Sequence, residues 1–229
     1  MDWPQDTSEL EASQRALAAE RPPLWTLPAS PIAICGCFVC FERGDSPRAG
    51  LAGERCWAAA AVIQDGKLVG TSTSSTDVAA PYVSGLLALR EGALLESLVR
   101  AVPIVPDVVL VDATGRDHPR RAGLALHLGA ALDLPTVGVT QRTLLAKGEP
   151  PSEQKGSRSP FFLDGEIVGC WVRTKTGARP LAIHPAWRTD LETAVAVVLR
   201  SLGRARTPEP LRKAREIART MRAAAMKDV

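Results

Sequence analysis

Residues 107–129 read DVVLVDATGRDHPRRAGLALHLG, and the rest of the chain can be interpreted around them. Four apolar residues, Val108–Val111, predict a strand that is buried on both faces of a sheet. The strand ends on a carboxylate, Asp112, and a loop with one histidine and three arginines follows. Ligands of open α/β sheets bind beyond the carboxyl ends of the strands. The loop is therefore a candidate site for metal-assisted chemistry on a phosphate ester, with a plain solvated loop as an equal alternative on this stretch alone.

A second carboxylate comes from a helix that is predicted to begin at Leu86. Its apolar stripe consists of Leu87, Leu94, Leu95 and Leu98. Glu91 lies on that same stripe. A carboxylate that faces inward costs stability unless it is paired or binds a metal. Glu91 therefore joins Asp112 as a candidate ligand, although a side chain at the edge of the stripe that reaches water explains its position equally well.

The remaining pattern predicts a mixed sheet with helices on its faces. Three strands come first, with a two-residue turn at Asp65-Gly66 between the second and third. Helices and strands then alternate, and two helices end the chain. The expected strands are 32–41, 58–63, 67–73, 108–111, 136–139, 167–172 and 180–183, and the expected helices include 8–19 and 122–132. Residues 147–159, rich in Gly, Pro, Ser and Lys, are expected to be a mobile insertion.

The two C-terminal helices carry recognisable start signals. The first is predicted to begin with a capping box, Thr189 to Glu192, and the second with Thr207 as its cap and Pro208 at its first helical position. The last helix carries four arginines on one face: Arg212, Arg215, Arg219 and Arg222. Such a stripe can follow phosphates, but a plain solvated face is the more common arrangement.

Composition limits the class of protein. The chain has 229 residues and a net charge of +3, which permits a polyanionic partner without requiring one. Its apolar runs are too short to span a membrane, and the N-terminus lacks a signal pattern. The expectation is a soluble, cytoplasmic protein with no membrane partner. Three of its five cysteines, Cys35, Cys37 and Cys40, lie on one predicted strand, and buried reduced thiols explain them better than a zinc site does.

Several stretches, in this order and spacing, resemble the endonuclease V family over most of the chain. They are ASQRALA (12–18), APYVSGLLALRE (80–91), VDATGRDHPRRAGLALHLG (111–129), DLPTVGV (133–139), ARPLAI (178–183) and TPEPLRKA (207–214). The resemblance implies an α/β fold of the RNase H-like type, made of an N-terminal helix and Pro-rich connector (1–31) and an endonuclease V-like domain (32–229). It also implies Mg²⁺-dependent cleavage, with Mn²⁺ as a substitute, near inosine or hypoxanthine in DNA or RNA.

The resemblance also assigns roles to single residues. Asp112 and Glu91 would be the catalytic metal ligands, and His118 would handle a phosphate or a proton. A wedge that inserts beside the altered base would consist of Pro81, Tyr82, Val83 and Gly85, and Arg120 and Arg121 would contact nucleic acid. Insertion of a side chain into the stack helps a base to flip out.

Three positions depart from the family pattern. The first-strand motif places an essential Asp where this chain has Phe38. A Lys of the family falls on Gln141, where Arg142 is the neighbour that would supply the lost charge, and a His falls on Trp187. Loss of supporting groups around a metal typically costs about 10- to 100-fold in affinity or activity. Loss of a direct carboxylate ligand is expected to cost more.

Three hypotheses follow. The favoured one is a protein that still recognises deaminated bases but cleaves slowly or not at all. The second is an active, Mg²⁺-dependent endonuclease V. The third is a scaffold that has been repurposed to bind a partner, which the retention of Tyr82, His118, Arg120 and Arg121 disfavours.

Overall fold

A computed structural model describes residues 2–42 and 49–227 of the chain. Its helices are α1 (Thr7–Ala19), α2 (Leu87–Ala101), α3 (Leu124–Leu132), α4 (Leu191–Arg200) and α5 (Glu209–Ala225). Its strands are β1 (Ala33–Phe41), β2 (Arg55–Gln64), β3 (Lys67–Asp77), β4 (Val108–Val111), β5 (Thr136–Thr140), β6 (Arg158–Leu163), β7 (Glu166–Val172) and β8 (Leu181–Pro185). None of the described helices is both long and apolar enough to cross a membrane.

The strands form one mixed sheet in the order β3-β2-β1-β4-β5-β8-β7-β6. The pairs β1–β4 and β4–β5 are parallel, and the other neighbours are antiparallel. All four residues of β4 are buried, as its apolar run predicts, because helices cover both faces of the sheet there. The predicted α/β fold, a central mixed sheet with flanking helices in a single domain, is confirmed.

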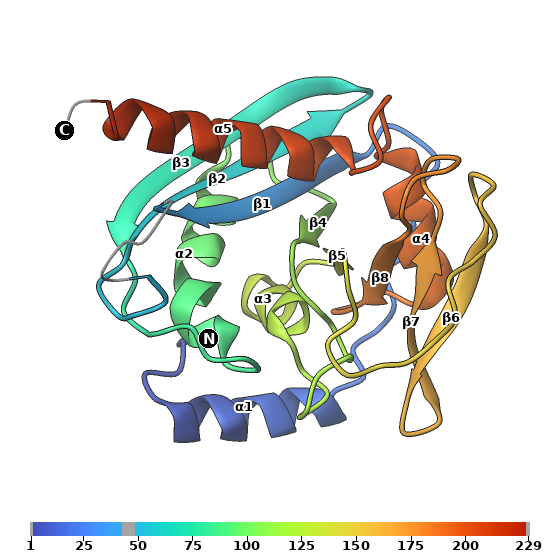
Figure 1. Ribbon diagram of the computed structural model, residues 1–229, viewed down its shortest axis with the longest axis horizontal. Helices are drawn as coiled ribbons and strands as arrows, with labels where there is room; N and C mark the ends of the chain where they lie inside the picture. The colour runs from blue at the N-terminus through green and yellow to red at the C-terminus, as the bar shows by residue number, and fades with distance from the viewer. Residues whose placement is uncertain (1, 43–48, 228–229) are drawn as a thin grey trace.

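The helices form two layers (Figure 1). On one face, α1, α2 and α3 share a core with β1, β2 and β4. On the other face, α4 and the start of α5 pack on the centre of the sheet, and α5 continues along β1 and β2. The approach of α5 is very close at Gly36, where a Cβ atom would lie 2.3 Å from the backbone of Pro210. Only glycine fits this position, and the contact fixes the start of α5 against β1.

Both C-terminal helices begin one residue later than predicted. The cap of α4 is Asp190, whose carboxylate accepts a hydrogen bond of 2.7 Å from the Thr193 N–H. Thr189 does not act as the cap because its hydroxyl bonds to Thr136 O and accepts from Ala186 N. Pro208 is the extended residue that precedes α5, so it does not occupy the first helical position.

The segment 147–159 holds more structure than the sequence indicates. Lys147 pairs with Phe162, and Arg173 donates to the carbonyls of Pro151 and Ser152. Its last residues open β6, a strand that the sequence analysis missed. The mobility of the segment stays a prediction.

The predicted state of the cysteines is confirmed. All five are buried, and none of them forms a disulfide. Cys35 and Cys37 belong to the core under α1–α3, whereas Cys40 faces α5, as alternation along a strand requires. Burial raises the pKa of Cys35 to about 12, so this thiol stays protonated and inert.

Candidate functional site

The two candidate ligands line one cleft of about 230 Å³ at the carboxyl end of β4. Because Cys37 pairs with Val111, the next residues along the two parallel strands, Phe38 and Asp112, lie side by side. Glu91 enters the same cleft from α2. Tyr82 and Leu87 form its outer wall. The structure thus brings Asp112, Glu91 and Phe38 together, as the register of the sequence motifs implies.

Arg215 of α5 partly neutralises Asp112. Its Nη2 atom lies 3.2 Å from Asp112 Oδ2, and 35% of the Asp112 side chain is exposed. The surrounding protein displaces water from this carboxyl and raises its pKa above the ordinary value. Arg215, and more weakly Arg219, oppose that rise. A cation that binds Asp112 must therefore compete with the Arg215 guanidinium, which already contacts this carboxylate.

Glu91 is more strongly perturbed. Burial raises its pKa to about 8, Arg90 opposes the rise, and Asp112 adds to it. Arg90 gives little compensation because its guanidinium is committed elsewhere, to Glu54 and to the carbonyls of Leu51 and Ala80. The cleft therefore holds two carboxyl groups with less positive charge than their ionised forms require.

Phe38 fills the position where a third carboxylate is expected. Like Ile217 and Met221 of α5, it packs against a small apolar cluster that includes Cys40 and Ala218. The guanidinium carbons of Arg215 and Arg219 lie 4.9 and 5.8 Å from the ring centroid. Among the described residues, no group of three or more His, Cys, Asp or Glu side chains could hold a metal. Two carboxylates still meet the minimum for one Mg²⁺ ion, which commonly binds through one or two carboxylates and completes its shell with water and phosphate.

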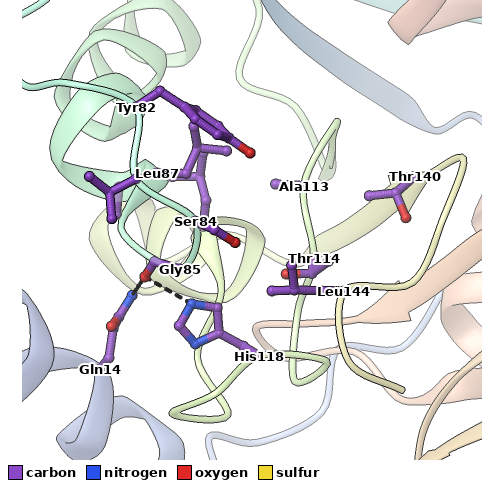
Figure 2. Close-up of a pocket in the computed structure, with 13 residues that line it drawn as sticks. Gln14, Tyr82, Ser84, Gly85, Leu87, Ala113, Thr114, His118, Thr140 and Leu144 are labelled. Atoms are coloured by element: carbon purple, nitrogen blue, oxygen red, sulfur yellow. Dashed lines mark hydrogen bonds between the residues drawn. The ribbon is translucent and has the colours of Figure 1, made fainter. Parts of the chain in front are cut away.

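A second pocket of about 130 Å³ adjoins the cleft and shares Tyr82 and Leu87 with it. Three parts of the chain surround it in Figure 2: the segment before α2, the loop after β4 and the loop after β5. Its lining is mostly apolar, with a few polar groups such as Ser84, Thr114 and Thr140. Concave, mostly apolar pockets with a few polar groups are typical binding sites for small ring systems.

The Gly85 carbonyl is the fixed point of this pocket. It accepts hydrogen bonds from Gln14 Nε2 (3.2 Å), His118 Nε2 (3.0 Å) and Arg120 Nη2 (3.0 Å). The first two are drawn in Figure 2. Gly85 has a φ of +82°, a conformation that L side chains rarely adopt. Side chains from two distant segments, α1 and the loop after β4, therefore hold one glycine in a conformation that glycine tolerates best.

Both ring nitrogens of His118 form hydrogen bonds. Its Nδ1 atom accepts from the Arg120 N–H at 3.2 Å, so Nε2 carries the proton that is donated to Gly85 O. Burial lowers the pKa of His118 to about 4. His118 lines the pocket and not the cleft that holds the two carboxylates. It is a neutral group that supports the segment before α2.

The loop after β5 is held by a buried carboxylate. Asp117, which has no exposed surface, accepts from the backbone N–H groups of Leu144, Leu145 and Ala146 at 2.6 to 2.8 Å. Leu144 lines the same pocket as His118. At the other end of this loop, the Thr140 hydroxyl lies 2.9 Å from His184 Nε2. Asp117 and His184 thus fix one wall of the pocket.

Both loop arginines that the resemblance assigns to nucleic acid have protein partners. Arg120 bonds to Gln14 and pairs with Glu11 of α1. Arg121 bonds to Leu163 O and pairs with Asp164 on the hairpin between β6 and β7. Their hydrogen bonds tie the loop after β4 to elements on either side of it.

The side chains of the proposed wedge are exposed, whereas its backbone is anchored. Tyr82 is 62% exposed and Val83 is 43% exposed. The segment is held through the Tyr82 N–H, which donates to Gly50 O, and through the bond from Arg90 to Ala80 O. An aromatic ring therefore projects from a rigid support at the boundary between the pocket and the cleft.

Two of the three departures from the family pattern lie outside the cleft. Gln141 is exposed and follows Thr140 at the edge of the pocket. Trp187 was expected at an active-site position, and this expectation is wrong. Trp187 bonds to Thr136 at the start of β5, whereas Asp112 follows the end of the parallel strand β4. A side chain at position 187 therefore lies at the opposite end of the sheet from the carboxylates.

Three residues of the site were missed by the sequence analysis. Arg90, Gln14 and Asp117 are all buried polar groups that hold backbone segments around the pocket. Arg90 stands next to Glu91 on α2, and Asp117 stands next to His118. A polar residue at an inward-facing helical position gave a usable signal for Arg90 and Gln14, whereas nothing local distinguishes Asp117 from a solvated loop residue.

A model of the family described as endonuclease V matches residues 34–216. An endonuclease V from Nostoc punctiforme is 39% identical over 163 residues, which cover 70% of this chain and 74% of the relative. The crystal structure of the endonuclease V from Streptomyces avermitilis superposes with a TM-score of 0.84 at 31% identity and covers 98% of this chain and 96% of its own.

A third structure is similar in fold. It is the Ciona intestinalis endonuclease V in complex with a 24mer DNA that contains an inosine followed by a ribo-adenosine. The TM-score is 0.76 at 21% identity, with 95% of this chain and 98% of the other covered.

Proposed function

Because the chain belongs to the endonuclease V family, we propose that it recognises inosine or hypoxanthine in DNA or RNA, and that its own cleavage activity is impaired. The observation that carries the proposal is the pairing of an intact pocket with an altered cleft. The pocket and the exposed Tyr82 adjoin each other, whereas the cleft has Phe38 beside Asp112.

Recognition would use the segment before α2. Pro81, Tyr82 and Val83 would enter the base stack, and Gly85, held by its three hydrogen bonds, would form the floor onto which the flipped base moves. The Ciona intestinalis relative was crystallised with inosine-containing DNA, which supports this choice of substrate. The hydrogen bonds of His118, Arg120 and Arg121 support positioning roles for these residues.

The family is generally dependent on a divalent metal ion. In this chain Asp112 and Glu91 would hold Mg²⁺, or Mn²⁺ in its place. When bound, the ion would neutralise charge on the phosphate and activate water. Asp112 and Glu91 would provide the negative charge that binds it, and Tyr82 and Leu87 would screen that charge from bulk solvent.

Impairment follows from the neighbours of these carboxylates. Phe38 offers no ligand atom, and Arg215 occupies one oxygen of Asp112. A metal ion must displace that guanidinium, and it would be held by one protein carboxylate fewer than the family pattern provides. Weak metal affinity and slow cleavage are the expected consequences.

An active Mg²⁺-dependent endonuclease V is the alternative, and one observation favours it. Asp112 and Glu91 still share an open cleft, and a bound cation would stabilise the ionised forms of both carboxyl groups, which burial disfavours. A repurposed scaffold is the third candidate.

Binding and cleavage of a single-inosine oligonucleotide, as DNA and as RNA, separate these functions. The expected result is preferential binding of the inosine strand, with slow cleavage in Mg²⁺ or Mn²⁺ that Asp112→Ala abolishes. Fast cleavage that Asp112→Ala abolishes would establish the active enzyme. Indifference to nucleic acid would leave only the scaffold.

A further inference from the structure

Arginines of α5 and of the segments before it interact electrostatically with Asp112 or with one another. Arg215 and Arg219 of α5 both act on Asp112. Arg206, which precedes α5, is influenced by Arg179 and by Arg215, and these like charges lower its pKa after the larger effect of burial. We call Arg179, Arg206, Arg215 and Arg219 the arginine cluster. Asp112 pairs with Arg215, and no other acid among the described residues forms an ion pair with the cluster, which therefore keeps an excess of positive charge.

The Phe38 ring holds two members of the cluster in place. Arg215 and Arg219 both lie over it at cation–π distance. This contact orients the guanidinium groups without using their hydrogen-bond donors. An aromatic platform at this position therefore presents arginine N–H groups toward the cleft.

Arg215 is incompletely satisfied. It makes one contact of 3.2 Å to Asp112 through Nη2, and its Nε atom is buried without a hydrogen-bond partner among the described residues. A buried N–H group without a partner costs about 1 to 3 kcal/mol. An anion with two oxygen atoms, such as a phosphate, can bind two N–H groups of one guanidinium at once.

We propose that Arg215 and Arg219, supported by Phe38, form a binding site for a backbone phosphodiester of nucleic acid that operates without a metal ion. The proposal rests on the proposed function, because nucleic acid must enter the cleft. In the free protein Asp112 occupies Arg215, and the incoming phosphate displaces this carboxylate. Tyr82 lines the same cleft, so a strand whose base meets the wedge would pass its phosphate near the cluster.

The test is the affinity for uncut oligonucleotides in EDTA, measured by fluorescence anisotropy across a range of salt concentrations. Arg215→Gln and Arg219→Gln should each weaken binding about tenfold and reduce the salt dependence by about one released ion, equally for inosine-containing and plain strands. Arg15→Gln on α1 is the matched control, because Arg15 is an exposed arginine on the opposite face of the sheet. Arg215→Lys keeps the charge and should give an intermediate affinity.

The competition between Asp112 and the phosphate for Arg215 predicts a second change in affinity, opposite in sign to that of the arginine variants. Asp112→Asn should strengthen binding in EDTA, and this gain should disappear when Arg215→Gln is added. Wild-type affinity in both arginine variants, or an effect that appears only with Mg²⁺, would overturn the proposal. The two proposals can fail separately: loss of inosine preference with arginine-dependent binding retained refutes only the base recognition. Urea unfolding of each variant checks that the fold is intact.

Discussion

Asp117 Oδ2 accepts a hydrogen bond of 2.6 Å from the backbone N–H of Leu144, although the two residues lie 27 positions apart. Two further N–H groups of the same loop reach Asp117, so a single buried carboxylate sets the wall of the pocket. Leu144 faces the segment that carries Tyr82 across the pocket. The shape of the pocket therefore depends on a residue that does not line it.

Asp117→Asn should lower the preference for inosine. The amide nitrogen cannot accept the Leu144 N–H, so at least one of the three bonds is lost, at about 1 to 3 kcal/mol of folding free energy. The ratio of affinities for inosine-containing and plain strands should fall more than the affinity for plain strands. Asp77→Asn is the control, because Asp77 is an exposed acid paired with Arg55. An unchanged ratio would mean that the loop keeps its place without this carboxylate.

Tyr82→Ala should weaken inosine preference more than overall affinity. The side chain is largely exposed, so its loss should leave the free energy of unfolding almost unchanged. Tyr82→Phe, which keeps the ring, should behave like the wild type in the same anisotropy assay. Equal weakening on all sequences would make Tyr82 a stacking platform without a role in selection.

Phe38→Asp should raise metal-dependent cleavage, and the double change with Gln141→Lys should raise it further. The new carboxylate would stand beside Asp112, as the pairing of β1 with β4 requires, and would supply a third ligand in the cleft. Cleavage of the single-inosine strand in Mg²⁺ is the measurement. Phe38→Ala, which removes the ring without adding a ligand, should give no gain. If the double variant is as slow as Phe38→Ala, the missing carboxylate is not what limits cleavage.

His127 should make the protein less stable in acid. Its ring is fully buried, stacks on Trp3 with centroids 4.7 Å apart, and has no hydrogen-bond partner for either nitrogen among the described residues. Burial lowers its pKa from 6.5 to about 4. The unfolded chain therefore binds this proton at a higher pH than the folded protein. The stabilisation is complete above pH 6.5 and is lost as the pH falls toward 4.

His127→Phe tests this assignment, since it keeps an aromatic ring against Trp3 and removes the titration. The wild type should lose up to about 1.4 kcal/mol per pH unit from His127 in this range. Urea unfolding at about pH 7 and about pH 5 should show a smaller loss for the variant. His118 and His184, whose pKa values are also lowered to about 4, should keep part of the acid sensitivity in both proteins. Equal losses in the two proteins would show that His127 does not contribute.

The parts of the site that could be predicted are those with a local signature. Asp112 was found because it ends a wholly apolar strand, and Glu91 because it interrupts a helical stripe; the structure brings them to one cleft. The approximate bounds of most helices and strands could be predicted as well, because hydrophobic periodicity is also a local signal. β6 was missed because its sequence, RSPFFL, carries a proline and does not alternate in the way that a half-buried strand does.

The remaining features depend on contacts between distant segments, which periodicity does not encode. His127 lies on the apolar helix α3, and the structure buries it with no hydrogen-bond partner for its ring nitrogens among the described residues. The arginine stripe of α5 was treated as one face, but Arg222 is buried and bonds to Phe41 O, and Arg212 pairs with Glu209. Of the four arginines of this stripe, Arg215 and Arg219 lie over the Phe38 ring.

The close contact between Gly36 of β1 and the start of α5 also affects how the cleft can change. The helix meets Gly36 through the main-chain atoms of Pro210 and Leu211, so at this point its distance from β1 is not set by the side chains at positions 38 and 215. Position 38 can therefore carry an acidic or an aromatic side chain, and position 215 a basic one, while the contact at Gly36 keeps its geometry. If both proposals hold, substitutions at these two positions convert one fold between a cleft that binds metal and a cleft that binds phosphate through arginine.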